Sequence, residues 1–82
     1  MKRSELDVLV HRREVLLRKI QAYEKVRRAI NDLAQQFLDD PYALEALSAV
    51  DRNLFNILVF MHQGLATIER KLKEVYGGVE HK

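Results

Sequence analysis

The chain has 82 residues, of which 48% are hydrophobic and 32% charged, and this is a globular or coiled-coil composition rather than a disordered one. A domain of this size buries only about 60% of the surface of its unfolded chain and usually needs disulfides, a metal or a partner chain. The absence of cysteine excludes disulfides and thiolate zinc sites. A formal net charge of +2 is too small to indicate nucleic acid or an anionic membrane by itself.

The chain has no recognisable targeting or membrane-spanning segment. Residues 1–7 include two acidic side chains and no uninterrupted apolar stretch follows them, so we expect no signal peptide and a cytoplasmic location. The longest uncharged run, residues 53–68, contains asparagine, histidine, glutamine and glycine. It is shorter than the roughly 20 apolar residues that a spanning helix needs, so a membrane span is not expected. A hairpin that associates with a membrane surface through this run stays an alternative.

The first predicted helix covers about residues 4–38. Its apolar residues recur every seven positions, and others fall at the intermediate spacing of three or four, which is typical of a helix with one apolar stripe. The row with seven-residue spacing is Leu9, Leu16, Tyr23, Ile30 and Phe37, and the residues between its members are Ile20, Val26, Leu33 and Ala34. Such a stripe requires a facing helix.

A helix break is predicted at residues 38–41. Asp40 is a good N-cap and Pro41 a good first helical residue, and the residue before a proline is disfavoured in helical geometry. A second helix therefore begins near Pro41. Gly77 and Gly78 can supply the left-handed residue that closes a helix, so we expect this helix to end at about residue 76.

The second predicted helix, residues 41–76, also carries a stripe. One row has seven-residue spacing and a second row flanks it: Leu47, Leu54, Met61, Ile68 and Val75, with Leu44, Leu58, Leu65 and Leu72. Two long helices joined by two or three residues must lie antiparallel. We therefore predict an all-α antiparallel hairpin as a single domain over residues 1–82, with paired residue numbers adding to about 79. Gly64 could bend this helix, or break it into a three-helix arrangement.

Residues 54–61 are the most informative stretch for function, because seven of these eight consecutive residues are apolar and surround the helix. One facing helix covers only one side of this stretch. The apolar surface that it leaves uncovered predicts an interface in a helical bundle of two or more chains, or with a partner helical protein. Asn56 within this band is a candidate for fixing register, or an edge residue facing water. The predicted interface residues are Leu54, Phe55, Asn56, Val59, Phe60 and Met61, with Leu9, Leu16, Tyr23, Ile30 and Phe37 from the first helix.

Charge is distributed unevenly along the predicted hairpin. Residues 11–28 hold seven lysines or arginines against two glutamates, whereas residues 31–58 hold five acidic residues against one arginine. The open half is therefore basic and the turn end acidic, which favours antiparallel or staggered association of neighbouring hairpins. An alternative is a small nucleic-acid-binding or virion-type accessory protein that uses the basic half. Its candidate contacts are Arg12, Arg13, Arg18, Lys19, Arg27 and Arg28.

Catalysis finds little support in the sequence. There is no glycine-rich phosphate loop and no serine, histidine and acid set at a suggestive spacing. We therefore expect no enzyme activity, no cofactor and no metal. The main hypothesis is a non-enzymatic helical protein-protein interaction module that self-associates or docks a partner helix.

One resemblance points to a particular family. The segment Leu38-Asp39-Asp40-Pro41, then Ala43-Leu44-Glu45-Ala46-Leu47 and residues 54–60, resembles the small helical-hairpin co-chaperones of bacterial type III secretion. It covers about half of the chain and implies a hairpin that holds needle subunits before export. The extended second helix, residues 65–76, departs from those shorter proteins.

Overall fold

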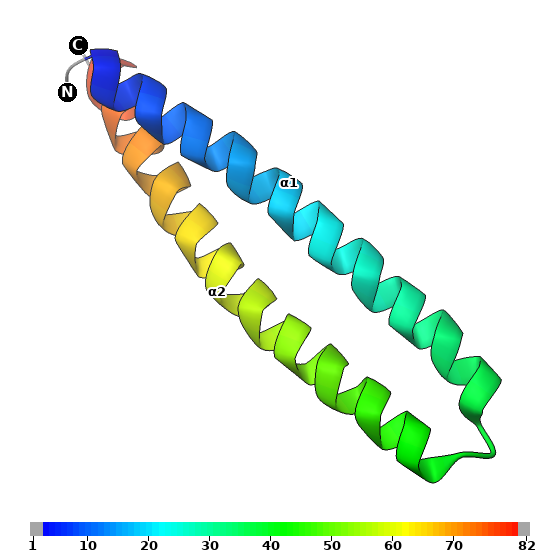
Figure 1. Cartoon of the computed structure of the whole chain (residues 1–82). Helices are drawn as coiled ribbons and strands as arrows, with labels where there is room; N and C mark the ends of the chain where they lie inside the picture. The colour runs from blue at the N-terminus through cyan, green and yellow to red at the C-terminus, as the bar shows by residue number, and fades with distance from the viewer. Residues whose placement is uncertain (1–2, 81–82) are drawn as a thin grey trace.

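The protein is a hairpin of two long antiparallel α-helices (Figure 1). The computed structural model describes residues 3–80, and the side chains of residues 4–75. Helix α1 spans Arg3–Ala34, the short 3₁₀ helix η1 spans Gln35–Phe37, and helix α2 spans Pro41–Glu80. The described residues contain no strand, and the molecule measures 63 × 16 × 15 Å. This confirms the predicted all-α hairpin.

The turn between the helices forms where the sequence predicts it. The Asp40 carboxylate accepts hydrogen bonds from the backbone N–H groups of Tyr42 at 3.2 Å and Ala43 at 3.1 Å, and the Leu44 N–H donates to the Asp40 carbonyl. Pro41 has no N–H to satisfy, so its place at the start of α2 costs no hydrogen bond. Asp40 is therefore the N-cap of α2.

The two helices meet along a heptad seam, the rows of α1 and α2 residues that face each other. In heptad notation, position a holds Leu6, Arg13, Ile20, Arg27 and Ala34 of α1, with Leu44, Asp51, Leu58, Leu65 and Leu72 of α2. Position d holds Leu9, Leu16, Tyr23 and Ile30 of α1, with Leu47, Leu54, Met61, Ile68 and Val75 of α2. Each of these residues is half-buried or buried. A strict repeat of this kind is typical of an antiparallel coiled coil.

The α1 side of the seam differs from the predicted stripe at several positions, since it also contains Leu6 and Arg13 and does not reach Phe37. Val26 and Leu33 were expected within the stripe, but they remain 49% and 39% exposed. Arg27, the residue after Val26, faces α2 instead, whereas Ala34, which was also predicted in the stripe, does lie in the seam. Arginine is accepted in the seam because Asp51 of α2 lies opposite it. The side-chain contacts between the helices join residues whose numbers add to between 78, for Arg27 and Asp51, and 86, for Glu24 and His62, so the predicted sum of about 79 lies at the lower end of this range.

The helix ends and the central glycine also refine the prediction. Helix α1 ends at Ala34, and η1 rather than α-helix continues to Phe37. Helix α2 passes Gly64 without a break and continues through Gly77 and Gly78 to Glu80. No glycine among the described residues has positive φ, so the left-handed cap expected after residue 76 does not form. A glycine permits a helix to stop but does not force it, and each added helical residue gains a hydrogen bond.

Candidate interaction surface

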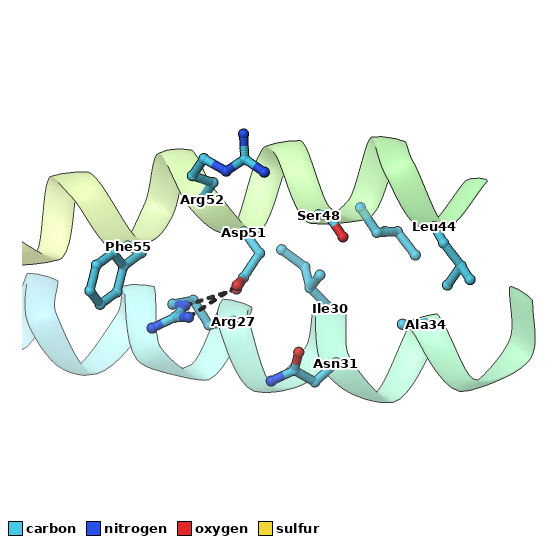
Figure 2. Close-up of a pocket in the computed structure, with 10 residues that line it drawn as sticks. Arg27, Ile30, Asn31, Ala34, Leu44, Ser48, Asp51, Arg52 and Phe55 are labelled. Atoms are coloured by element: carbon cyan, nitrogen blue, oxygen red, sulfur yellow. Dashed lines mark hydrogen bonds and ion pairs between the residues drawn. The ribbon is translucent and has the colours of Figure 1, made fainter. Parts of the chain in front are cut away.

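An ion pair lies within the heptad seam, between α1 and the first half of α2. Arg27 Nε donates to Asp51 Oδ1 at 2.8 Å, and Arg27 Nη2 donates to Asp51 Oδ2 at 3.0 Å, so the two planar groups form a fork (Figure 2). The hydrogen bond from Arg27, aided by the guanidinium charge, holds the pKa of Asp51 below its usual value. Both groups occupy position a, where an apolar residue is the rule. The pair therefore specifies how α1 and α2 are aligned.

A groove runs beside this ion pair. It encloses about 440 Å³ and is open to solvent. In Figure 2, Arg27 and Asp51 point toward each other across it, with Phe55 beyond them and Arg52 directed away. The Arg27 guanidinium carbon lies 5.1 Å from the centre of the Phe55 ring, within the range of a cation–π contact. Phe55 is thus partly engaged within the hairpin, although half of its surface remains exposed.

A further ion pair and a contact between a histidine and a glutamate join the helices on the same side of the seam as Phe55. Arg13 Nε lies 3.3 Å from Glu69 Oε1, and His62 Nε2 lies 3.6 Å from Glu24 Oε1. All four side chains are between 43% and 56% exposed, so solvent screens these pairs and each contributes little to stability. On this side of the hairpin, α1 and α2 therefore contact each other through polar side chains.

The opposite side of the seam is almost entirely apolar. Heptad positions g and c of both helices point to it, and over residues 22–33 and 43–60 they carry no charge. We call this surface the apolar face; it consists of Ala22, Val26, Ala29, Leu33, Ala43, Ala46, Val50, Asn53, Ile57 and Phe60. Its five large side chains are exposed by 39% to 72%, with Phe60 the most exposed. A contiguous exposed apolar surface of this kind marks an interaction site.

The side with the ion pairs has a different composition over a similar length. Positions e and b there hold charged or amide side chains, with two large apolar residues. We call this surface the polar face; it consists of Gln21, Glu24, Arg28 and Asn31 of α1 and Gln35 of η1, with Glu45, Ser48, Arg52, Phe55, Val59 and His62 of α2. The hairpin therefore has one face suited to packing against another apolar surface and one suited to water.

The interface residues expected from the sequence fall into separate environments. The residues that face the partner helix within the same chain are Leu9, Leu16, Tyr23, Ile30, Leu54 and Met61. Phe55 and Val59 lie on the polar face, whereas Phe60 lies on the apolar face. Asn56 is exposed at position f, the position that points away from α1. Phe37 lies in η1 and is 37% exposed.

The basic residues named as candidate nucleic-acid contacts do not share one face. Arg13 and Arg27 are at position a and pair with acidic side chains of α2. Arg12 and Lys19 are at position g, which points to the same side as the apolar face. The remaining two lie elsewhere, Arg18 at position f and Arg28 at position b.

Val26, Leu33, Val50 and Ile57 are interface candidates that the sequence reasoning missed. All four occupy position g, and they recur seven apart within each helix. The same seven-residue count that revealed the seam could have found them, once Arg27 and Asp51 were assigned to the seam. The sequence alone did not place Arg27 and Asp51 in the seam, because both are charged. The apolar residue next to Arg27, Val26, was therefore assigned to the seam in its place.

Two further features, a metal-binding cluster and a membrane-spanning helix, are not found in the described part of the chain. No group of three or more histidine, aspartate or glutamate side chains there could hold a metal ion. Neither α1 nor α2, over the residues described, is long and apolar enough to cross a membrane. The chain matches no protein-family model, and no curated protein or solved structure is detectably similar to it.

Proposed function

We propose that this protein is a non-enzymatic helical assembly module that binds another helical surface through its apolar face. The observation that carries the proposal is the exposure of five large apolar side chains on one uncharged surface: Val26, Leu33, Val50, Ile57 and Phe60. A helix face of this kind is stabilised when another apolar helix face covers it.

The thin core of the hairpin supports the same proposal. Only Ile20, Leu58 and Leu72 are buried among the described side chains, and none of these three is less than 4% exposed. A two-helix hairpin has one layer of side chains between its helices, so it buries little surface for each residue that it orders. Covering the apolar face gives the hairpin the second layer that a bundle has.

A pair of matched double variants tests the proposal. Ile57→Gln/Phe60→Gln removes one β-branched and one aromatic side chain from the apolar face of α2. Phe55→Gln/Val59→Gln removes the same two kinds of side chain from the polar face of the same helix. Circular dichroism first establishes that both variants keep their helices.

Light scattering and sedimentation velocity over the micromolar range give the mass of each protein, and binding of an apolar dye reports any uncovered apolar surface. We expect the apolar-face variant to lose association, or to lose dye binding where the chain is monomeric, while the polar-face variant behaves like the wild type. Equal masses and equal dye binding for the two variants would contradict the proposal, because the two faces would then be equivalent.

A further inference from the structure

We infer that the apolar face is covered by a second copy of this chain that runs in the opposite direction, so that the turn of each copy lies beside Arg12 and Lys19 of the other. This inference rests on the proposed function and specifies its partner. It follows from the position of the apolar face along the hairpin and from the charges at its two ends.

The apolar face does not lie at the middle of the hairpin. Its residues span 22–33 in α1 and 43–60 in α2, so its centre is at the level of the ion pair between Arg27 and Asp51. The turn is about 18 Å from this level, at 1.5 Å per residue, and the open end is roughly twice as far. Two copies that superimpose their apolar faces therefore have only two symmetric choices, with their turns together or at opposite ends.

The sizes of the side chains on the apolar face are compatible with both orientations of the two copies. With the turns at opposite ends, Leu33 meets Ala22 of the other copy, Ile57 meets Ala46 and Phe60 meets Ala43. With the turns together, Leu33 meets Ala46, and Ala22 meets Ile57. Large residues meet small ones in either case, as close packing of four helices requires. Size therefore does not select the orientation.

Charge selects between the two choices. With the turns together, Asp39 and Asp40 of one copy lie beside the same residues of the other, and like charges repel. With the turns at opposite ends, these aspartates reach the level of residues 12–19 of the other copy, where Arg12 and Lys19 occupy position g on the side of the apolar face. The antiparallel pair thus joins opposite charges at both ends of its interface.

Three of the charged residues that would meet at these two ends, Arg12, Lys19 and Asp39, have no ion pair within the described part of their own hairpin. Inside the described part of the chain, two ion pairs join Arg13 to Glu69 and Arg27 to Asp51, and His62 contacts Glu24. None of these three pairs uses Arg12, Lys19 or Asp39, which are all exposed. Their charges are available to a neighbouring copy.

The overlap is large enough for a specific pair. Two antiparallel copies centred at this level share a length of about 36 Å, and two helices side by side are about 20 Å wide. The contact therefore covers about 700 Å² on each copy, close to the roughly 800 Å² of a standard stable interface. The open ends of both copies extend beyond the contact.

A distance measurement on the full chain distinguishes the two orientations. The chain has no cysteine, so His11→Cys introduces a single attachment site for a nitroxide spin label at an exposed position f, away from the apolar face. In the antiparallel pair the two labels lie about 50 Å apart, because each residue 11 is about 24 Å from the common centre and the two lie on opposite sides of it. With the turns together they lie about 30 Å apart, the width of a four-helix bundle.

A charge reversal at the turn gives a second, independent readout, because its sign depends on orientation. Asp39→Lys places a cation beside Arg12 and Lys19 in the antiparallel pair, and we expect the dissociation constant to rise about three-fold or more. With the turns together, the same change removes the repulsion between Asp39 and its copy, and the dissociation constant falls. Asp7→Lys is the matched control, since it makes the same charge change at position b, outside the contact.

The outcomes separate this inference from the proposed function. A separation near 50 Å with weaker association of Asp39→Lys supports the antiparallel pair. A dimer that has a short separation, or that Asp39→Lys strengthens, overturns the inference while the apolar face remains an assembly surface. A wild-type chain that stays monomeric, yet loses dye binding in Ile57→Gln/Phe60→Gln, also overturns it and leaves the face to a different helical partner.

Discussion

The apolar face and the polar face flank the same heptad seam, yet they are built in opposite ways. On the polar face, polar side chains of α1 and α2 contact each other across the seam, as His62 and Glu24 do, and the Arg27 guanidinium lies over the Phe55 ring. On the apolar face no such contact is made among the described side chains, and Val26, Leu33, Val50, Ile57 and Phe60 remain open to solvent. The difference teaches that exposed apolar residues on one helix are not equivalent, because their surroundings decide whether they are available to another chain.

The largest expected effect is a loss of stability on substitution of a seam residue, which should far exceed the loss on substitution of a residue on either face. Leu58 is buried in the seam at 4% exposure, and Leu58→Ala should lower the free energy of unfolding by about 3 kcal/mol, through lost burial and the cavity left behind. Phe60→Ala, two residues later on the apolar face, should change the stability of a dissociated chain by less than about 0.5 kcal/mol. Urea unfolding at equal, low protein concentration measures both. Equal losses in the two variants would mean that the apolar face belongs to the core of the hairpin.

A smaller effect is expected at the turn, where both faces end. Asp40→Ala removes the hydrogen bonds to the Tyr42 and Ala43 N–H groups and should cost about 1 kcal/mol in unfolding free energy. Asp40→Asn retains an accepting oxygen and should lose much less, which makes it the control. Thermal unfolding of the wild type, Asp40→Asn and Asp40→Ala at one protein concentration measures their order of stability. A loss as large in the asparagine variant would assign the effect to the charge rather than to the cap.

Gly64 should give a gain of similar or smaller size. It lies at position g, the same heptad position as Val50 and Ile57, within a continuous helix. A Cβ added there would lie 3.5 Å from Leu16 Cδ2, an ordinary van der Waals contact. Gly64→Ala should therefore raise the free energy of unfolding by about 0.5–1 kcal/mol, because alanine favours the helix and loses less entropy on folding. A destabilised variant would indicate that α1 and α2 approach more closely at this level.

The smallest effect should come from acid, and it concerns the ion pair beside the polar face. The pKa of Asp51 is lowered in the folded hairpin by the hydrogen bond from Arg27, so the pair stabilises the fold above the unfolded pKa of about 3.9. This stability is lost as the pH falls through the lowered pKa. Urea unfolding between neutral pH and pH 3 should show a difference between wild type and Asp51→Asn that narrows in acid. A stability difference that does not change with pH would contradict the view that the ionised Asp51 stabilises the fold through Arg27.

Much of the fold was predictable from spacing alone, whereas the two faces were not. Asp40 and Pro41 fixed the turn, and Leu47, Leu54 and Met61 located the seam of α2. The interface was harder, because residues 54–61 are apolar all round and spacing cannot tell which side meets α1. Arg27 and Asp51 decide it, and each looks out of place in an apolar row until the other is known. Their pairing is a contact between residues far apart in sequence, which periodicity within one helix cannot reveal.

The order of contacts along the hairpin has a consequence for how the molecule closes. Arg27 and Asp51 are 24 residues apart in sequence, whereas Arg13 and Glu69 are 56 apart. Closing the longer loop first would cost about 0.7 kcal/mol more in chain entropy, so folding that starts near the turn and proceeds toward the open end is favoured. Amide hydrogen exchange should then be slowest near Asp51 and faster toward the ends of the helices. The apolar face lies in the part that closes first, so it is complete before the rest of the hairpin has formed.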